Sequence, residues 1–355
     1  MKELFLDEVS ALFPRQSAAR SVGVGIEHEL LTRDLVDGSA VAIDRVRRAV
    51  RGSSYERWVG FEPGGQVELS LPCFPSVSAL GRTWCRTVRW LREDCARSGV
   101  LLDAEPVDPR SPGTVPLQLT SPRYAGMQRH LDRIGPAGRR MMRQTASTQV
   151  CLDWWPGRAG GEQWRLLLLA GPFLAAAFAR SSGPGSRLAT WRAVDPSRTA
   201  YDNRLLRGHD PVAAYADFAA GAAVFAMPNT AETDEPTTFA TWARTHDVDA
   251  AAVAHHLSTL FPPVRPRGRY LEVRFLDVQP DELVVPLSAL LSRLLYDDDV
   301  RRQALRIVQY DDPRFVDHWE TAAHAPERLA DRGTALVRLA AGSRTTTTPD
   351  LVGVA

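Results

Sequence analysis

The stretch SVGVGIEHELL, residues 21–31, alternates small or apolar residues with charged ones, which is typical of a β-strand. Residues 146–154 and 269–276 (RYLEVRFL) repeat this alternation far along the chain. Between the first two of these stretches, residues 59–71 read as two extended pieces around a Pro-Gly-Gly turn at 63–65. The sequence therefore predicts strands that are widely separated along the chain.

Helical segments separate the strands. Apolar residues recur at three- and four-residue spacing in 76–98, and 3–13 has the pattern of a short amphipathic helix. Residues 127–142 are predicted to be helical with a break at a proline, and 286–341 to be mostly helical. The apolar run 166–179 is too short to span a bilayer and predicts a buried helix. Strands spread among helices without a regular βαβ order favour an α+β domain with a mainly antiparallel sheet.

The composition limits how this protein could hold a phosphate group. Lys2 is the only lysine among 355 residues, and the sequence contains no G-x-x-x-x-G-K-[ST] motif. Phosphate binding would therefore fall to arginines, backbone amides and metal ions. The net charge of +1, with arginines interspersed among acids, makes nucleic acid the least favoured partner.

The sequence also indicates the domain organisation and the cellular compartment. We expect one catalytic domain over residues 1–341 and a disordered tail over 342–355, because SRTTTTP has the composition of a frayed end. The four cysteines match neither a zinc ribbon nor a disulfide framework, and the N-terminus lacks the pattern of a signal peptide. These features favour a cytoplasmic protein with reduced thiols and no membrane partner. The oligomeric state stays open.

Five glutamates occupy positions from which they could share one face of the sheet. They are Glu27 and Glu29 on the first strand, Glu62 and Glu68 on either side of the glycine turn, and Glu272 on the last strand. Successive odd positions of a strand point the same way, and hard carboxylate oxygens suit Mg²⁺. Each signal is also compatible with a structural explanation: a solvated strand face, an exposed hairpin tip, or a structural ion pair of Glu272 with Arg274.

Two familiar motifs are excluded. His28-Glu29 begins like the zinc-protease motif H-E-x-x-H, but Thr32 stands where the second histidine should be. Gly23 and Gly25 are not followed by a third glycine at the spacing of a dinucleotide-binding loop. Neither a zinc protease nor a Rossmann fold is therefore indicated.

The same residues resemble a known family. Residues 25–29 (GIEHE) are similar to the G-x-E-x-E strand of glutamate–cysteine ligases, and 61–70 (FEPGGQVELS) resemble a conserved turn of the plant and actinobacterial branch. Residues 141–153 (MMRQTASTQVCLD) and the R-x₃-W-x₃-D-x₂-R spacing at 187–198 also resemble that branch. Residues 259–277 are most similar to the actinobacterial ligases that open ergothioneine biosynthesis. The motifs occur in order over most of the chain.

The resemblance implies a glutamine-synthetase-like catalytic domain with a curved, mainly antiparallel sheet flanked by helices. It implies that Mg²⁺ is held by the five acidic positions, Glu27, Glu29, Glu62, Glu68 and Glu272. It implies contacts with substrate or ATP from Gln149, Arg187, Trp191, Arg198 and Arg274. Glu272 and Arg274 are the expected catalytic pair.

The reaction that the resemblance implies is an ATP-dependent ligation. The glutamate γ-carboxylate would form a γ-glutamyl phosphate, which the cysteine amine would attack to give γ-glutamylcysteine. Cys151 stands where the family usually has asparagine. A ligase of the same mechanism with another amine acceptor therefore stays open, as does a catalytically silent homologue that only binds ligand. Trp191 and Gln149 could also have purely structural roles.

Overall fold

A computed structural model describes residues 2–15, 18–208, 210–227, 236–308 and 315–342. Apart from Gly342, the tail predicted at 342–355 lies outside these residues, so the expectation of disorder stays a prediction.

A seven-stranded sheet forms the centre of the protein, and the strands that pair in it are antiparallel. Its spatial order is β2 (Val59–Phe61), β3 (Val67–Phe74), β1 (Val24–Asp34), β5 (Thr148–Asp153), β7 (Tyr270–Val273) and β6 (Val264–Pro266), with β4 (Val100–Asp103) pairing the outer end of β1. The predicted strands and the Pro-Gly-Gly turn are confirmed, although β7 ends at Val273 and is shorter than the predicted 269–276. The α+β class with a mainly antiparallel sheet is confirmed.

Fifteen α-helices lie in the described part of the chain. They are α1 (Lys2–Ser10), α2 (Ile43–Val50), α3 (Val77–Arg97), α4 (Pro122–Ile134), α5 (Ala137–Gln144), α6 (Gly157–Ala177), α7 (Arg187–Val194), α8 (Pro196–Thr199), α9 (Pro211–Gly221), α10 (Phe239–Trp242), α11 (Ala250–Ser258), α12 (Asp281–Tyr296), α13 (Asp298–Val308), α14 (Phe315–His324) and α15 (Ala330–Ala341). The predicted helix at 127–142 is confirmed as two helices, with the break at Gly135-Pro136. The helical final third begins earlier than predicted, because Pro286 lies inside α12.

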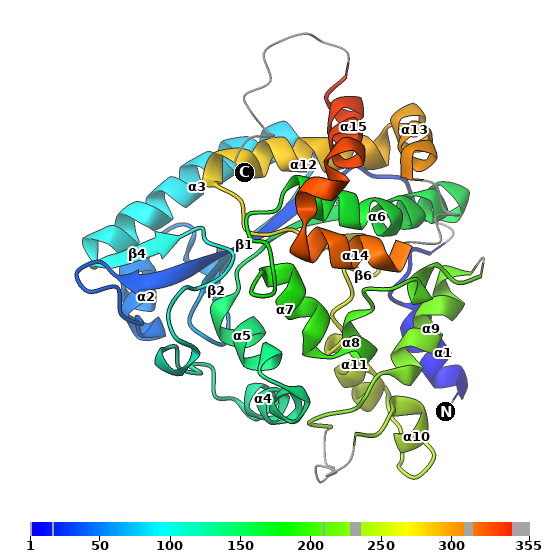
Figure 1. Cartoon of the computed structure of the whole chain (residues 1–355), viewed down its shortest axis with the longest axis horizontal. Helices are drawn as coiled ribbons and strands as arrows, with labels where there is room; N and C mark the ends of the chain where they lie inside the picture. The colour runs from blue at the N-terminus through cyan, green and yellow to red at the C-terminus, as the bar shows by residue number, and fades with distance from the viewer. Residues whose placement is uncertain (1, 16–17, 209, 228–235, 309–314, 343–355) are drawn as a thin grey trace.

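Two long helices, α3 and α12, lie side by side and cover one face of the sheet (Figure 1). Residue 28 of β1 points to this covered face: the His28 ring contacts the edge of the Trp84 ring on α3, with 5.0 Å between centroids. Because side chains alternate along a strand, Glu27 and Glu29 point to the opposite face. The sheet therefore separates a packed side from the side that carries the carboxylates.

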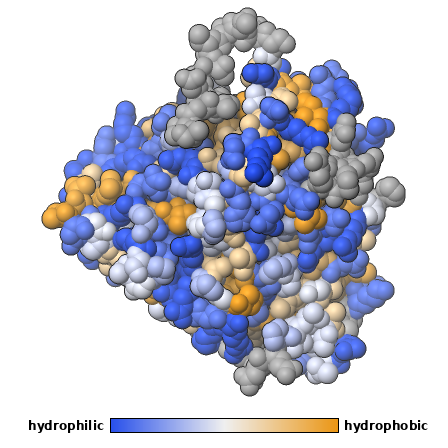
Figure 2. All heavy atoms as spheres, in the orientation of Figure 1, coloured by the Kyte–Doolittle hydropathy of each residue, from blue (hydrophilic) through white to orange (hydrophobic). Residues whose placement is uncertain are grey.

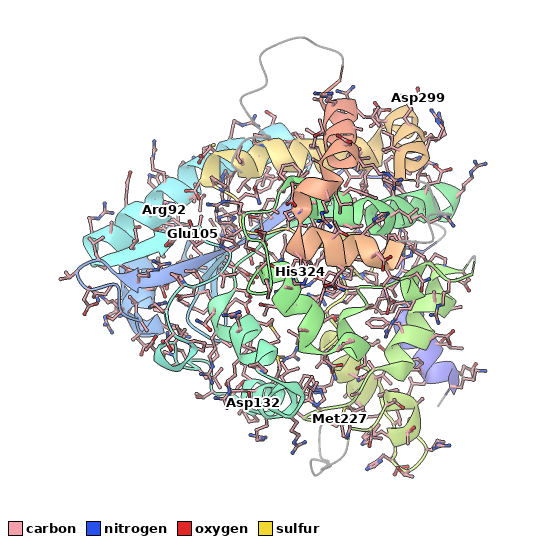
Figure 3. The ribbon with its side chains drawn as sticks, viewed as in Figure 1. Arg92, Glu105, Asp132, Met227, Asp299 and His324 are labelled. Atoms are coloured by element: carbon pink, nitrogen blue, oxygen red, sulfur yellow. The ribbon has the colours of Figure 1, made fainter. Side chains whose placement is uncertain are left out.

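The packed side holds β1 by a polar network as well as by apolar contacts. His28 Nδ1 lies 3.0 Å from the Thr148 hydroxyl, and its Nε2 lies 3.8 Å from Asp281 at the start of α12. Arg92 of α3, labelled in Figure 3, donates to both Asp281 oxygens and to the Leu102 carbonyl. Burial lowers the pKa of His28 to about 4, so the ring is neutral near pH 7. This network fixes the strand segment that carries Glu27 and Glu29.

Beyond the sheet, β1 and β4 continue as a two-stranded ribbon that projects to the left in Figure 1. Its end exposes Leu35, Val36 and Leu101, and Figure 2 shows a hydrophobic patch at this edge of an otherwise mixed surface. Within the described residues, no helix combines the length and the hydropathy that a membrane crossing requires.

Candidate active site

A glycine turn brings two of the predicted carboxylates together. Gly65 adopts a φ of +93°, and its amide donates to the Glu62 carbonyl at 2.8 Å. A Cβ on Gly64 would lie 2.5 Å from the backbone of Arg143 on α5, so only glycine fits there. The turn folds the Glu62 side of the hairpin back over the Glu68 side, as the sequence predicted.

Three glutamates meet at this turn. Glu29 of β1 stands directly opposite Glu68 of β3 in the register, and one carboxylate oxygen each of Glu29, Glu62 and Glu68 lies within 4.8 Å of the other two. Burial raises the pKa of Glu62 well above its usual range, and the neighbouring Glu29 and Glu68 raise it further. Burial likewise raises the pKa of Glu29, with Glu68 adding to the effect. The carboxyls of Glu29 and Glu62 thus lack enough nearby positive charge to ionise easily.

Hydrogen bonds orient two members of the acidic cluster. The Ser147 amide donates to Glu29 Oε2 at 2.7 Å, and the Gln149 side-chain amide donates to Glu29 Oε1 at 2.9 Å. On β3, the Ser70 hydroxyl donates to Glu68 Oε1 at 2.6 Å. Glu29 and Glu68 are therefore held in place by neutral donors, while Arg187 and Arg274 offset the effect of burial on the Glu29 pKa only in part.

Glu27 lies on the same face, next to the acidic cluster but outside the set of three. It stands opposite Ser70 on one side and Gln149 on the other. Burial, followed by repulsion from Glu272 and Glu68, raises the pKa of Glu27 to about 7. Glu27 therefore lies between the acidic cluster and Glu272 and feels negative charge from both sides.

Glu272 has very different surroundings. Its side chain is 1% exposed, and each of its oxygens contacts a guanidinium: Oε2 accepts from Arg265 Nε at 2.6 Å and Arg274 Nη1 at 3.1 Å, and Oε1 lies 3.0 Å from Arg267 Nε. Burial alone would raise the pKa of Glu272, but Arg265 and Arg274 outweigh it and hold the pKa below its usual range. We call Arg265, Arg267 and Arg274 the arginine triad.

Gln149 connects the two groups. Its side-chain oxygen accepts from Arg274 Nη1 at 2.6 Å, while its nitrogen donates to Glu29. One amide therefore spans the gap between the arginine triad and the acidic cluster, which agrees with its predicted place in the site.

Arg187 and Trp191 of α7 lie over Arg274. The Trp191 ring lies 5.8 Å from the Arg274 guanidinium carbon and 5.5 Å from that of Arg187. Arg187 donates to the Arg274 carbonyl at 3.0 Å, but its Nε and Nη1 are buried without a hydrogen-bond partner among the described residues. An unpartnered buried guanidinium is costly, so these N–H groups suit an anionic ligand.

Arg198 is placed differently from the expectation of a substrate contact. It is fully buried, and it donates to Asp195, to the carbonyl and hydroxyl of Thr259, and to the Ala223 carbonyl. These bonds join α8 to two neighbouring loops. The structure therefore gives Arg198 a structural environment, because its donors are already used by the protein.

The acidic cluster fits a divalent cation. Among the residues that the structure describes, no arginine or lysine forms an ion pair with Glu29, Glu62 or Glu68. Carboxylate oxygens are hard ligands that suit Mg²⁺, which binds through a few carboxylates together with substrate phosphates. The arginine-saturated Glu272 does not share this property.

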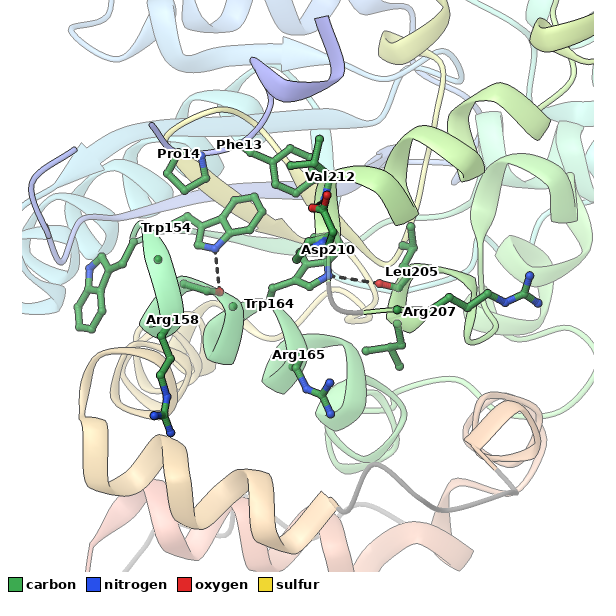
Figure 4. Close-up of a pocket in the computed structure, with 17 residues that line it drawn as sticks. Phe13, Pro14, Trp154, Arg158, Trp164, Arg165, Leu205, Arg207, Asp210 and Val212 are labelled. Atoms are coloured by element: carbon green, nitrogen blue, oxygen red, sulfur yellow. Dashed lines mark hydrogen bonds between the residues drawn. The ribbon is translucent and has the colours of Figure 1, made fainter. Parts of the chain in front are cut away.

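A separate cavity of about 450 Å³ opens beyond the end of β5 (Figure 4). Its wall includes Trp154 and Trp164, whose indole N–H groups donate to the Gly160 and Leu205 carbonyls, and Arg158 and Arg165 extend away from these rings. None of the predicted site residues lines it. The acidic face, not this cavity, is the candidate site.

Two members of the arginine triad were missed in the sequence. Arg265 and Arg267 stand in the segment VRPRGRY, four and two residues before Arg269 respectively. The signal that could have found them is the alternation itself, because β6 pairs with β7 and places Arg265 directly opposite Glu272.

The chain is similar to known ligases over most of its length. Residues 23–334 match the model of glutamate–cysteine ligase family 2. A protein named glutamate–cysteine ligase EgtA from Mycolicibacterium smegmatis is 33% identical over 267 residues, which cover 68% of this chain and 60% of that protein. Its namesake from Mycobacterium tuberculosis is 33% identical over 297 residues, covering 77% of this chain and 66% of that protein. This chain thus matches somewhat less than two thirds of the length of these curated relatives.

Solved structures are similar only at a low level. A glutamate–cysteine ligase from Francisella tularensis in complex with AMP has a TM-score of 0.48 at 14% identity, covering 93% of this chain and 83% of that one. A bifunctional glutathione synthetase from Pasteurella multocida has a TM-score of 0.47 at 12% identity, covering 99% of this chain and 48% of that one.

Proposed function

The chain belongs to glutamate–cysteine ligase family 2, and from this premise we propose that it joins the γ-carboxylate of glutamate to the amine of cysteine at the expense of ATP. The observation that carries the proposal is the acidic cluster of Glu29, Glu62 and Glu68 on the sheet face opposite α3 and α12. A ligase without a phosphate-binding lysine needs such a site for the metal that accompanies ATP.

Mg²⁺ would be held by Glu29, Glu62 and Glu68, with Glu27 beside them. When bound, the ion neutralises phosphate oxygens and fixes the position of the phosphoryl group. Gln149 and the Ser147 amide keep Glu29 pointing toward the shared position.

The chemistry takes place in two displacements. A γ-carboxylate oxygen of glutamate attacks the γ-phosphorus of ATP, so that an O–P bond forms, the bond to the β-phosphate oxygen breaks and ADP leaves. The cysteine amine then attacks the acyl carbon of γ-glutamyl phosphate, and inorganic phosphate leaves as the amide forms. Both steps depend on positioning and on charge stabilisation more than on covalent help from the protein.

Arg274 is the residue best placed to stabilise negative charge. Its guanidinium is fixed by Glu272 and by Gln149, and Trp191 lies over it. A fixed planar guanidinium matches two phosphate oxygens at once. Arg187, with its buried unpartnered N–H groups, would take a carboxylate or phosphate of a substrate.

The test is ADP release by the purified protein with Mg·ATP and glutamate, comparing cysteine with a panel of other amines. We expect release only when glutamate and cysteine are both present, with γ-glutamylcysteine detected by mass. The Arg274→Ala variant should lose activity by on the order of 10²–10³. Wild-type protein that binds Mg·ATP but releases no ADP with any amine would overturn the proposal in favour of a silent homologue.

One observation favours a second candidate, a ligase of the same mechanism with another amine acceptor. Cys151 stands opposite Glu272 in the register and replaces the asparagine usual in the family. Release of ADP that requires glutamate and an amine other than cysteine would support this candidate. Supply of γ-glutamylcysteine to ergothioneine biosynthesis is part of the main proposal, on the strength of the EgtA relatives.

A further inference from the structure

The arginine triad surrounds the carboxylate of Glu272 and forms a cationic site. Three guanidinium groups pair with a single Glu272, and Glu27 and Glu29 act on them only from beyond ion-pair distance. Arg265 and Arg274 are largely buried and Arg267 is partly exposed, so a ligand that enters here meets guanidinium groups whose charge is not fully paired. The ligand that this site can take is therefore a multiply charged anion.

The donors that remain free in the triad point to the same conclusion. Arg265 and Arg267 contact Glu272 through Nε, and the terminal nitrogens of Arg265 have no hydrogen-bond partner among the described residues. Arg274 Nε is buried without a partner in the same part of the structure. Terminal guanidinium N–H pairs bind two phosphate oxygens in parallel, which an ammonium group cannot do.

The register places the triad and the acidic cluster on one face. Arg265, Glu272, Cys151 and Gly25 stand opposite one another across β6, β7, β5 and β1. The acidic cluster lies on β1 and β3, and the single Gln149 amide of β5 reaches from Glu29 to Arg274, so the two groups adjoin. An extended polyphosphate with its metal ion could contact both.

We propose that Arg265 and Arg267, held in place by Glu272, bind the polyphosphate chain of the nucleotide, and that Glu272 positions these arginines and is not a ligand of Mg²⁺. The inference rests on the proposed use of ATP. It assigns Arg265 and Arg267 to substrate binding and makes Glu272 a positioning residue, because both of its oxygens are already occupied by guanidinium groups.

Inorganic tripolyphosphate in EDTA is the probe for the anion site, because its binding needs neither metal nor turnover. Isothermal titration calorimetry on the full chain should show that Arg267→Ala and Arg265→Lys weaken tripolyphosphate by about tenfold or more, the range expected for loss of a charged hydrogen bond. Arg267 is 42% exposed, so its removal should leave the fold intact. Arg269→Ala, an exposed arginine two residues away, is the matched control and should change affinity less than about twofold.

Mn²⁺ binding, followed by electron paramagnetic resonance, tests the role of Glu272. The Glu272→Gln variant should bind the same number of Mn²⁺ ions as the wild type and bind tripolyphosphate more weakly. A lost Mn²⁺ ion in Glu272→Gln, unchanged tripolyphosphate affinity in both arginine variants, or weakened binding of glutamate in place of tripolyphosphate would each overturn the inference. Wild-type protein that binds tripolyphosphate through the triad but makes no γ-glutamylcysteine would refute the proposed reaction and leave the anion site standing.

Discussion

The two ends of one sheet face place the same residue type in opposite situations. In the acidic cluster, Glu29, Glu62 and Glu68 gather without an ion-pair partner among the described residues, and burial raises the pKa values of Glu29 and Glu62. At the other end, Glu272 is more deeply buried, yet the arginine triad keeps its pKa low. The comparison teaches that burial alone does not decide the state of a carboxylate; the charge of its neighbours does.

The largest effect should come from breaking the acidic cluster. Glu62→Gln removes one of the proposed metal ligands, so we expect turnover to fall by on the order of 10²–10³. Measured in EDTA by chemical denaturation, the free energy of unfolding should stay equal or rise, because one buried carboxylate fewer reduces the repulsion.

Glu93→Gln serves as the control for this variant, because Glu93 is an exposed residue of α3 that pairs only loosely with Arg89 at 3.9 Å. Both its turnover and its stability should match the wild type. A metal-free Glu62→Gln protein that is clearly less stable than the wild type would mean that the three carboxylates do not repel one another.

Removing the carboxylate at the centre of the arginine triad should change the free energy of unfolding in the opposite direction. Glu272→Gln leaves three guanidinium groups around a neutral side chain, so we expect the free energy of unfolding to fall by about 3 kcal/mol. Urea denaturation in EDTA measures this on the same scale as Glu62→Gln. Equal changes in the free energy of unfolding for Glu62→Gln and Glu272→Gln would show that the acidic cluster and the arginine triad do not differ in this respect.

Much of this face could be predicted from sequence. The alternation at 21–31 assigned Glu27 and Glu29 to one side of a strand, and the Pro-Gly-Gly turn predicted that Glu62 and Glu68 would approach each other, because both patterns are local. The pairing of Arg265 with Glu272 was missed because β6 is only three residues long and includes Pro266, so it gives a weak strand signal. Strand order is not local, so the sequence did not show that β5 would lie between β1 and β7.

The structural role of Arg198 could not be predicted from the sequence either. A spacing motif shows that an arginine is present but not whether the fold already satisfies its donors, and here Asp195 and Thr259 accept them. For Glu272, the sequence predicted the position of the side chain but not its contacts. The sequence placed it correctly on the face, but only the structure shows that guanidinium groups occupy both of its oxygens.

A Gln149 variant tests the link between the acidic cluster and the arginine triad without removing a charge. Gln149→Leu abolishes the amide bridge between Arg274 and Glu29, so both side chains lose a fixed orientation. We expect turnover to fall by about tenfold, as for loss of a supporting residue around a metal ligand. Steady-state kinetics should show the loss mainly in kcat, whereas a variant as active as the wild type would show that the bridge is dispensable.

The smallest expected effect concerns His256, a buried residue outside both the acidic cluster and the arginine triad. His256 donates from Nε2 to the Ala219 carbonyl at 2.8 Å, and burial lowers its pKa to about 3. Below pH 6.5 the unfolded chain takes up the proton first, so His256 should remove stability as pH falls toward 3, by about 1 kcal/mol between pH 6 and 5.

His256→Gln keeps a donor but does not titrate, so its unfolding free energy should fall less steeply over this interval. Urea denaturation at pH 6 and pH 5 measures the difference. Identical slopes for the variant and the wild type would show that this histidine is not a source of acid sensitivity.

The absence of lysine from the candidate site has a consequence for the fate of the activated substrate. A γ-glutamyl phosphate is an acylating agent and would modify an amine on the protein as readily as it modifies cysteine. The only lysine, Lys2, lies on α1, and the site residues that carry positive charge are arginines, whose guanidinium groups are poor nucleophiles. Burial, with Glu27 and Glu272 nearby, raises the pKa of Cys151, which keeps that thiol protonated and unreactive. The proposed enzyme would thus hold a reactive acyl group among side chains that cannot capture it, leaving the incoming amine as the nucleophile that ends the reaction.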